Sequence, residues 1–307
     1  MTKKITSAKN KTTFDRYQVA TDIIVEALEA GRIPWIRPWK KGAEKAQDLQ
    51  IPHNAVSGRP YTGLNVLLLQ AVGFNYPTQQ YLTGNQVKQL GGTIPRENYT
   101  KGHFIIFFNI IKREDEDGNK STFPILKHFY VYNLAQVEGV DESKFPAIER
   151  EVLTTTDMTK IAGLHNIDLR YGGDKAFFSP SRDFIQMPEQ SKFEDANTFD
   201  ETLGHEMTHW TGHKDRLGRE FGKRFGDHAY AFEELVAEMG SAFLAVQLDR
   251  PLRTLQHAAY LNSWINVLKT DKKAILTAAS SARKACELLI EPIKAELEEE
   301  LPLEKSA

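Results

Sequence analysis

The sequence predicts an α+β fold arranged as two domains, at residues 1–140 and 150–307. Its 307 residues, of which 41% are hydrophobic and 26% are charged, have an ordinary globular composition and are enough for two cores. Helix-period and strand-like segments occur in both halves. Charge also divides the chain: residues 1–130 carry 18 Lys and Arg against 11 Asp and Glu, a balance of +7, and the remainder carries 21 against 30, a balance of −9. We therefore expect one basic and one acidic domain.

The first half is expected to open with helices. Thr13 can cap a helix over residues 14–30, in which apolar side chains recur on one side. A second helix is expected after Gly63. A third starts at Thr83, which forms a capping box with Gln86. These signals place helix starts at three points before the first long strand-like run.

Two strands are expected next. Residues 103–111 and 123–133 are rich in β-branched and aromatic side chains, and Asp117-Gly118 is a typical turn between them. The loop around that turn is acidic, which favours a solvated hairpin tip. Residues from 136 to about 150 lack the pattern of a strand or long helix, so we expect the link between the domains there.

The second half contains an H-E-x-x-H motif, His205-Glu206-Met207-Thr208-His209. Residues four apart in a helix lie on one face, so the two imidazoles can bind one cation. Glu206 is turned away by about one residue, where it can hold a water without binding the metal. The motif is typical of zinc metallopeptidases, in which this glutamate is the general base.

The helix with the motif is expected to start near Phe199, after a cap at Asn197 or Thr198, and to end at Gly212. The remaining expected elements are two short strands before it and two helices after it, at residues 175–178, 183–187, 252–270 and 272–299. A strand beside the metal-binding helix would give an extended peptide an edge to pair with.

Two histidines do not complete a zinc site, and the sequence offers two schemes for a third ligand. In the first, Glu234 and Glu238 share a helix face, and we expect Glu234 to bind the metal while Glu238 accepts the outer N–H of a ligating histidine. Glu238 is the alternative ligand. In the second, the motif extends to H-E-x-x-H-x-x-G-x-x-D and Asp215 binds the metal, a variant of the metzincin pattern. Zn2+ is the expected ion, and Mn2+ or Co2+ can occupy such ligands.

Peptide hydrolysis at this site also requires an electrophile that stabilises the tetrahedral oxyanion. His213, His228 and Tyr230 lie in the motif region and are the candidates. Apolar residues surround each of them, which favours an ordinary packing role instead.

Three stretches of the second half belong together: F-I-Q-M-P from Phe184, H-E-M-T-H-W-T-G-H-K-D-R-L from His205 and Y-A-F-E-E-L-V-A-E from Tyr230. They resemble the metallopeptidase domain of ArdC-type antirestriction proteins, which conjugative plasmids carry. The first half resembles the same proteins in P-W-I-R-P-W from Pro34, G-R-P-Y-T-G-L-N from Gly58, L-T-G-N-Q from Leu82, L-G-G from Leu90 and V-Y-N-L-A-Q-V-E-G from Val131. The resemblance implies an N-terminal α+β domain that binds single-stranded DNA and a C-terminal zincin-like metallopeptidase domain.

Basic and aromatic residues alternate near the start of the first half, a combination that suits phosphate contact and base stacking. The candidate DNA-binding residues, five of them within the resembling stretches, are Arg32, Trp35, Arg37, Trp39, Lys40, Lys41, Arg59 and Asn65. The alternative is that the tryptophans pack on the core and the lysines are simply solvated.

The resemblance implies a cytoplasmic antirestriction protein of a conjugative plasmid or mobile element, with single-stranded DNA and a protein or peptide substrate as partners. A DNA-coating protein with a structural metal site and a DNA-triggered protease for DNA–protein crosslinks are the alternatives. A single cysteine, Cys286, excludes an intramolecular disulfide. No signal peptide is expected at the basic start, and the apolar run at 104–111 is too short to cross a membrane.

Overall fold

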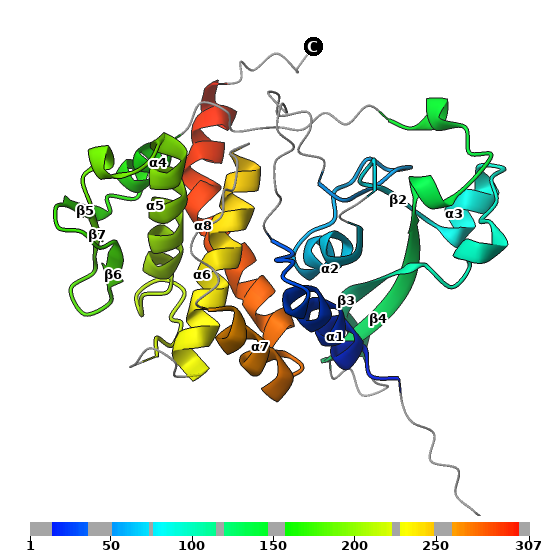
Figure 1. Cartoon of the computed structure of the whole chain (residues 1–307), viewed down its shortest axis with the longest axis horizontal. Coiled ribbons are helices and arrows are strands. Elements are labelled where there is room, and N and C mark those ends of the chain that lie inside the picture. The colour runs from blue at the N-terminus through cyan, green and yellow to red at the C-terminus, as the bar shows by residue number, and fades with distance from the viewer. Residues whose placement is uncertain are drawn as a thin grey trace, which may run out of the picture.

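The computed structural model describes residues 14–35, 51–73, 76–114, 120–146, 157–222, 228–248 and 260–300. An N-terminal part, residues 14–146, lies beside a C-terminal part, residues 157–300 (Figure 1). Each part combines helices with its own small sheet, which confirms the α+β prediction. Among the described residues, no helix is long and apolar enough to cross a membrane.

The N-terminal part contains a four-stranded sheet in the order β1-β2-β4-β3. Its strands are β1 (His53–Asn54), β2 (Gln80–Thr83), β3 (His103–Glu114) and β4 (Lys120–Asn133). Its helices are α1 (Arg16–Glu29), α2 (Leu64–Gly73) and α3 (Gly84–Gln89), and short 3-10 turns lie at Arg96–Asn98, Leu134–Gln136 and Glu142–Lys144. The three expected helices are therefore present, and the predicted capping box of Thr83 with Gln86 is confirmed.

The cap of α1 differs from the prediction. Asp15, not Thr13, is the cap, because its Oδ1 accepts the backbone N–H groups of Tyr17 at 3.0 Å and Gln18 at 3.2 Å. Thr13 lies outside the described residues.

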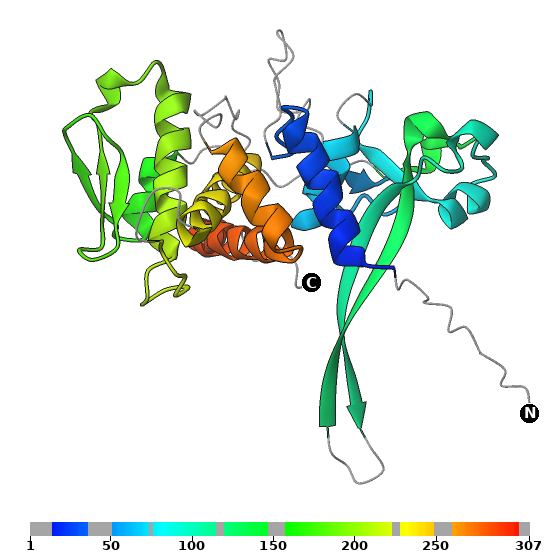
Figure 2. The same ribbon diagram turned by 60° about the horizontal axis from the view of Figure 1, so that its bottom comes forward.

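Strands β3 and β4 form the predicted hairpin, and it is longer than expected. They pair without interruption from His103 opposite Val131 to Glu114 opposite Lys120. Strand β2 pairs with β4 as far as Thr83 opposite Val131, and the hairpin projects beyond this point as an arm from the body (Figure 2). The predicted turn at Asp117-Gly118 lies outside the described residues.

The C-terminal part has a three-stranded sheet in the order β5-β7-β6 and five helices among its described residues. Its elements are α4 (Met158–Leu164), β5 (Asp168–Tyr171), β6 (Phe177–Ser179), β7 (Phe184–Met187), a 3-10 turn at Gln190–Lys192, α5 (Ala196–Thr211), α6 (His228–Gln247), α7 (Leu261–Thr270) and α8 (Ala274–Glu300). The sequence did not predict α4 or β5. The expected helix at 252–270 is described only from Leu261, because residues 249–259 lie outside the described stretches.

Helix α5 begins one turn earlier than expected. Asp195 is its cap, and the Oδ1 of Asp195 accepts the backbone N–H of Thr198 at 2.8 Å, so the predicted cap at Asn197 or Thr198 is wrong. Gly212 ends the helix as predicted. Helix α6 packs closely against α5, since a Cβ atom at Gly240 would lie 2.4 Å from Cγ2 of Thr208. This close approach brings the two helices that carry the metal donors together.

One hydrophobic cluster spans the two parts. It joins buried residues of α1, α2 and β3 to buried residues of α6, α7 and α8. The ring of Trp35 meets that of Trp264 edge to face at 5.5 Å, and Thr21 Oγ1 donates to the backbone carbonyl of Lys272 at 2.8 Å. Lys272 also pairs with Asp15 at 2.6 Å. The helix that carries Glu234 therefore packs partly on the N-terminal part.

Candidate metal centre

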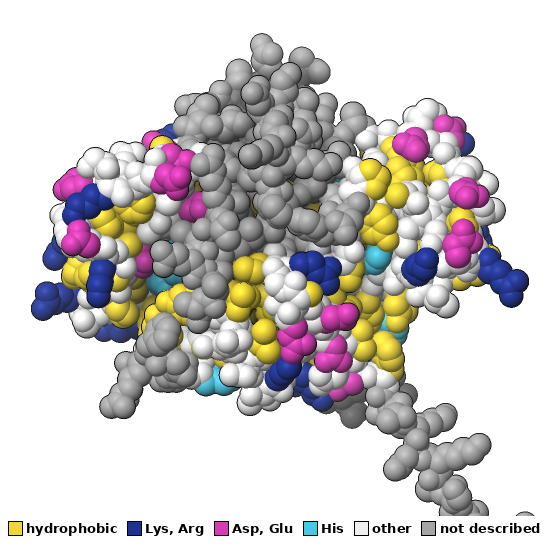
Figure 3. Space-filling model, in the orientation of Figure 1, with side chains coloured by type: hydrophobic (Ala, Val, Ile, Leu, Met, Phe, Trp, Pro, Cys, Tyr) yellow, Lys and Arg dark blue, Asp and Glu magenta, His cyan; other side chains and the backbone are white. Residues whose placement is uncertain are grey.

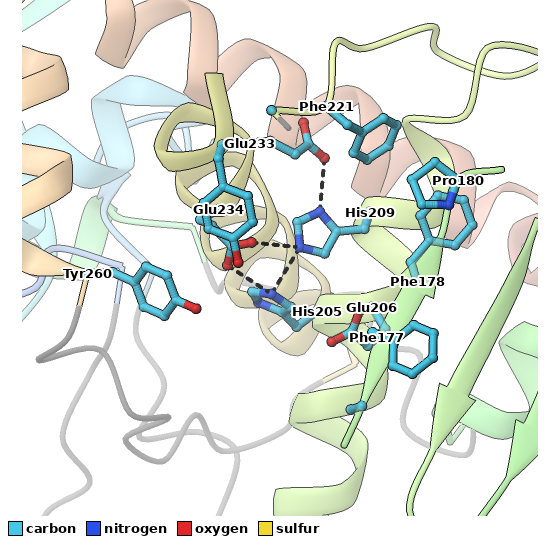
Figure 4. A pocket seen from close by; sticks show the side chains of 13 residues that line it. Phe177, Phe178, Pro180, His205, Glu206, His209, Phe221, Glu233, Glu234 and Tyr260 are labelled. Atoms are coloured by element: carbon cyan, nitrogen blue, oxygen red, sulfur yellow. Dashed lines mark hydrogen bonds and ion pairs between the residues drawn. The ribbon is translucent and has the colours of Figure 1, made fainter. Parts of the chain in front are cut away.

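Two neighbouring helices bring three metal donors to one point. His205 and His209 lie one turn apart on α5, and Glu234 lies on α6 (Figure 4). The two Nε2 atoms are 3.1 Å apart, and the carboxylate oxygens of Glu234 lie 3.6 Å from each of them. These residues form the group that could hold a metal ion among the described residues.

The spacing of the donors fits a tetrahedral ion. Zinc bonds to nitrogen and oxygen are roughly 2.0–2.2 Å long, which places tetrahedral ligand atoms roughly 3.3–3.6 Å apart. The separations of 3.1, 3.6 and 3.6 Å need little adjustment to meet that geometry. Two imidazoles and one carboxylate are also a common donor set for zinc sites that keep a position open.

His209 is held in its orientation by a buried carboxylate. Its Nδ1 lies 3.0 Å from Oε1 of Glu233, so Nδ1–H can donate there while Nε2 keeps its lone pair for a metal. Arg219 fixes this carboxylate from the other side, with Nε donating to Oε2 at 2.9 Å and Nη2 donating to Oε1 at 2.8 Å. Burial raises the pKa of Glu233, but the bonds from His209 and Arg219 outweigh it and hold that pKa below its usual value.

His205 is surrounded by carboxylates. Its Nδ1 lies 3.5 Å from Oε1 of Glu238, an ion-pair separation and not the hydrogen bond that the first scheme predicts, whereas Glu234 takes the place of the ligand. Burial lowers the pKa of His205, but the hydrogen bond with Glu234 and the charges of Glu238 and Glu206 outweigh it and raise the pKa to about 9. The same field of carboxylates attracts a divalent cation.

The donors open into a cavity of about 320 Å³. Glu206, which is 7% exposed, lies on its wall beside the histidines (Figure 4). Apolar and aromatic residues also line the cavity, namely Ala176, Phe177, Phe178, Pro180 and Phe221. The cavity thus combines a proton acceptor, a cation site and a surface suited to apolar side chains.

Two phenols complete the lining. Tyr230 forms side-chain hydrogen bonds with Glu234 and with Tyr260, and both tyrosines line the cavity. Burial is the main cause that raises the pKa of each phenol, so both remain neutral donors near pH 7. The ring of Tyr260 stacks on that of Trp264, with centroids 6.0 Å apart.

Several predicted residues are not brought into the site. Asp215 is not part of the metal group and its side chain is 73% exposed, so the structure does not bring it to the donors as the metzincin-like scheme expects. His213 is buried beside Phe178 and is not part of the cavity lining, and His228 is exposed at the start of α6. Of the three proposed electrophiles, Tyr230 lines the cavity.

Sequence reasoning missed Arg219 and Tyr260. Neither belongs to a spaced motif. Arg219 follows the helix in a loop that passes close to Gly212, where a Cβ atom would lie 2.8 Å from its Nη2. A pattern of residue spacing has no means to reveal this contact.

The predicted DNA-binding residues have different outcomes. Trp35 is 4% exposed and packs on Trp264, which is the core-packing alternative, so no base can stack on it in this arrangement. The Asn65 amide is bonded to the backbone of Ile106 at 2.8 and 2.9 Å. Arg32 and Arg59 are exposed, and Arg32 donates to the carbonyl of Ala71. The remaining candidates, Arg37, Trp39, Lys40 and Lys41, lie outside the described residues.

Both parts of the chain are similar to known proteins. Residues 157–281 match the family described as zincin-like metallopeptidase, and residues 14–132 match the N-terminal domain of anti-restriction factor ArdC. The metal-free crystal structure of the antirestriction ArdC protein from plasmid R388 is 36% identical, with a TM-score of 0.71, over 91% of this chain and 98% of that chain. The chain belongs to the ArdC family of antirestriction proteins.

Other relatives of this ArdC family member extend the comparison. The Mn(II)-bound structure of R388 ArdC is 35% identical with a TM-score of 0.72, over 91% of this chain and 98% of that one. The uncharacterized protein y4eC of Sinorhizobium fredii is 32% identical over 89% of this chain and 91% of its own. DNA primase TraC of Escherichia coli is 31% identical over 87% of this chain but only 26% of its own length. The match to the zincin-like family and the three converging donors together show that this domain carries a metal site at His205, His209 and Glu234.

Proposed function

We propose that this ArdC family member binds single-stranded DNA through its N-terminal part and hydrolyses peptide bonds at the His205, His209 and Glu234 centre, protecting the incoming DNA of a conjugative plasmid or mobile element. The observation that carries the peptidase is the opening of the three donors into a cavity that Glu206 also lines. A structural metal site would instead be closed by a fourth ligand.

A zinc ion held by these residues would polarise a water and a peptide carbonyl, and Mn2+ or Co2+ could take its place. Glu206 then acts as the general base: its carboxylate takes a proton from the attacking water and passes it to the leaving amine nitrogen. The bidentate bond between Arg219 and Glu233 keeps His209 in its orientation throughout.

The position of β6 suits an extended peptide. Phe177 and Phe178 of β6 line the cavity, and β6 is an outer strand of the described sheet, antiparallel to β7. Backbone bonds to such an edge hold a substrate with little demand on its sequence. The apolar wall would then favour a large apolar side chain next to the scissile bond.

The two phenols supply hydrogen-bond donors for the oxyanion. Tyr230 is tied to Glu234, and Tyr260 lines the same cavity from the start of α7. A single well-placed donor of this kind contributes roughly 100- to 1000-fold to the rate. Tyr260, which sequence reasoning missed, is our first choice for this role.

DNA binding by the N-terminal part is supported by its match to the ArdC N-terminal domain and by the balance of +7 over residues 1–130. The excess supplies an electrostatic attraction for phosphates that weakens with salt. Two of the relatives, R388 ArdC and TraC, are named for antirestriction and DNA priming, functions that involve DNA.

The deciding experiment compares wild-type protein with Glu206→Gln, loaded with Zn2+ or Mn2+, on an unfolded protein substrate, with and without a single-stranded oligonucleotide. We expect cleavage by the wild type, and none by the variant, although the variant should bind metal and DNA as the wild type does. Glu194→Gln, at an exposed glutamate away from the cavity, is the matched control.

Each outcome has a distinct meaning. Cleavage that persists in Glu206→Gln would reject the proposed base. No cleavage in any condition, together with bound metal and tight DNA binding, would favour the coating protein with a structural site. Cleavage that requires the oligonucleotide would favour the DNA-triggered protease.

A further inference from the structure

The burial of Trp35 leaves open which aromatic side chains meet DNA bases. In the described N-terminal part, five large aromatic side chains that are at least 46% exposed lie on or beside the β3–β4 hairpin: Phe14, Tyr99, Phe107, Phe129 and Tyr130. Phe14 and Tyr130 lie against the rings of His128 and Phe104, where they border the packing of α1. The two phenylalanines of the strands themselves have a different setting.

Phe107 and Phe129 lie on one face of the hairpin, with Lys127 beside them. Phe107 is opposite Lys127, and Phe129 is opposite Ile105. Opposite residues of an antiparallel pair share a face, and every second residue along a strand returns to it. Lys127 is exposed. We call these three residues the ribbon patch.

The same face is covered nearer the body and uncovered at the patch. Ile105 is 7% exposed and Val131 is fully buried, because they pack with Leu69 of α2 and with Tyr81 of β2. Phe129, opposite Ile105, is 46% exposed, and Phe107, one step further from the body, is 51% exposed. The pairing of β2 with β4 also stops at Val131. Two half-exposed aromatic rings thus lie on the hairpin where its cover by α2 and β2 ends.

We propose that the ribbon patch stacks the bases of single-stranded DNA, with Lys127 near the phosphates between them. This inference rests on the proposed binding of single-stranded DNA and assigns residues to it. Unpaired bases offer flat faces to aromatic rings, and a neighbouring cation tracks the backbone. Bases in a duplex are already stacked, so a patch of this kind distinguishes single strands from duplex DNA.

The size and charge of the patch favour DNA over a protein partner. Two half-exposed phenylalanine rings offer roughly 200 Å², far less than the roughly 800 Å² per partner of a stable protein interface. On the face drawn in Figure 3, acidic and basic side chains are interspersed over the described surface, with no continuous basic field. The patch itself holds one cation, Lys127, beside two aromatic rings, so stacking is expected to supply much of its affinity.

The test measures the affinity of the full-length protein for a fluorescent oligothymidylate over a series of salt concentrations. Phe107→Ala and Phe129→Ala should each weaken binding roughly 5- to 100-fold. The slope of log affinity against log salt should not change, because no cation is removed. Lys127→Ala should instead reduce that slope by about 0.7, the release expected for one phosphate contact on a single strand.

Conservative variants and a matched control separate stacking from folding. Phe129→Trp should retain binding, and its fluorescence should be quenched by the single strand but not by the same sequence as a duplex. Tyr171→Ala removes an aromatic ring that is 47% exposed in β5 of the C-terminal part and should bind as the wild type does.

Three results would overturn the proposal. Alanine variants that bind like the wild type would remove the patch while leaving DNA binding intact. A wild type that binds no single-stranded DNA would reject DNA binding itself, and the patch with it. A wild-type dimer that dissociates in Phe107→Ala, measured by sedimentation, would assign the patch to contact between two copies of the chain.

Discussion

The metal centre and the proposed N-terminal DNA-binding region depend on the sequence in different ways. The metal donors lie on two helices, and the spacing within α5 alone places His205 and His209 on one face. In the N-terminal region, Trp35 is buried because it packs on Trp264, a residue far along the chain. Local periodicity therefore predicts a site that helices carry, but not a binding surface that depends on what covers it.

The largest effect is expected at the metal centre. His205→Ala removes a ligand and should lower metal affinity by more than roughly 100-fold, since changes to supporting residues alone reduce it roughly 10- to 100-fold. Metal content after dialysis and calorimetric titration measure this loss. His228→Ala, at an exposed histidine outside the donor group, should keep full metal content. If His205→Ala kept its metal, the assignment of His205 as a metal ligand would be wrong.

A substitution of Trp35 tests the other side of the comparison. Trp35→Ala should lower the free energy of unfolding by about 3–5 kcal/mol, because a buried ring leaves a cavity in the cluster that joins the two parts. Urea unfolding measures this change, and Trp35→Phe should restore part of it. Folded Trp35→Ala protein should still bind single-stranded DNA. Normal stability combined with lost DNA binding would instead return this residue to the DNA surface.

Tyr260→Phe should slow the peptidase without loosening the site. The ring can keep its stacking on Trp264, and only the hydroxyl is lost. We expect kcat to fall roughly 100- to 1000-fold, with KM and metal content close to those of the wild type. Tyr171→Phe serves as the control. Equal kcat in Tyr260→Phe and wild type would exclude this phenol as an oxyanion donor.

Glu233→Gln tests the support of His209. The amide keeps the shape of the carboxylate but loses the charge that binds both His209 and Arg219. Metal affinity should fall roughly 10- to 100-fold. Glu220→Gln, at an exposed glutamate next to Arg219 in the loop after α5, should have no effect. The measurement is competition with a chelator of known affinity. An unchanged affinity would mean that packing alone orients the imidazole.

These differences show what the sequence could and could not predict. The hairpin, the three early helices and the two histidines with Glu234 follow from periodicity, capping and spacing, which act over a few residues. The helix caps are Asp15 and Asp195, and the predicted caps were neighbouring residues. Ser, Thr, Asn and Asp are all suitable caps, so only the folded geometry selects among neighbours. Arg219 and Tyr260 were missed because only the tertiary fold brings them to the site.

The smallest expected effect concerns Asn65, which the sequence assigned to DNA. Its side chain accepts from the backbone N–H of Ile106 at 2.9 Å and donates to the carbonyl of the same residue at 2.8 Å. Asn65→Ala would leave both groups without these bonds and should lower the free energy of unfolding by about 1–3 kcal/mol. Asn85→Ala, at an exposed asparagine of α3, should leave stability unchanged. Thermal unfolding and oligonucleotide binding are measured on the same samples. Reduced affinity at unchanged stability would assign Asn65 to the DNA surface, whereas reduced stability at unchanged affinity would confine it to holding β3 against α2.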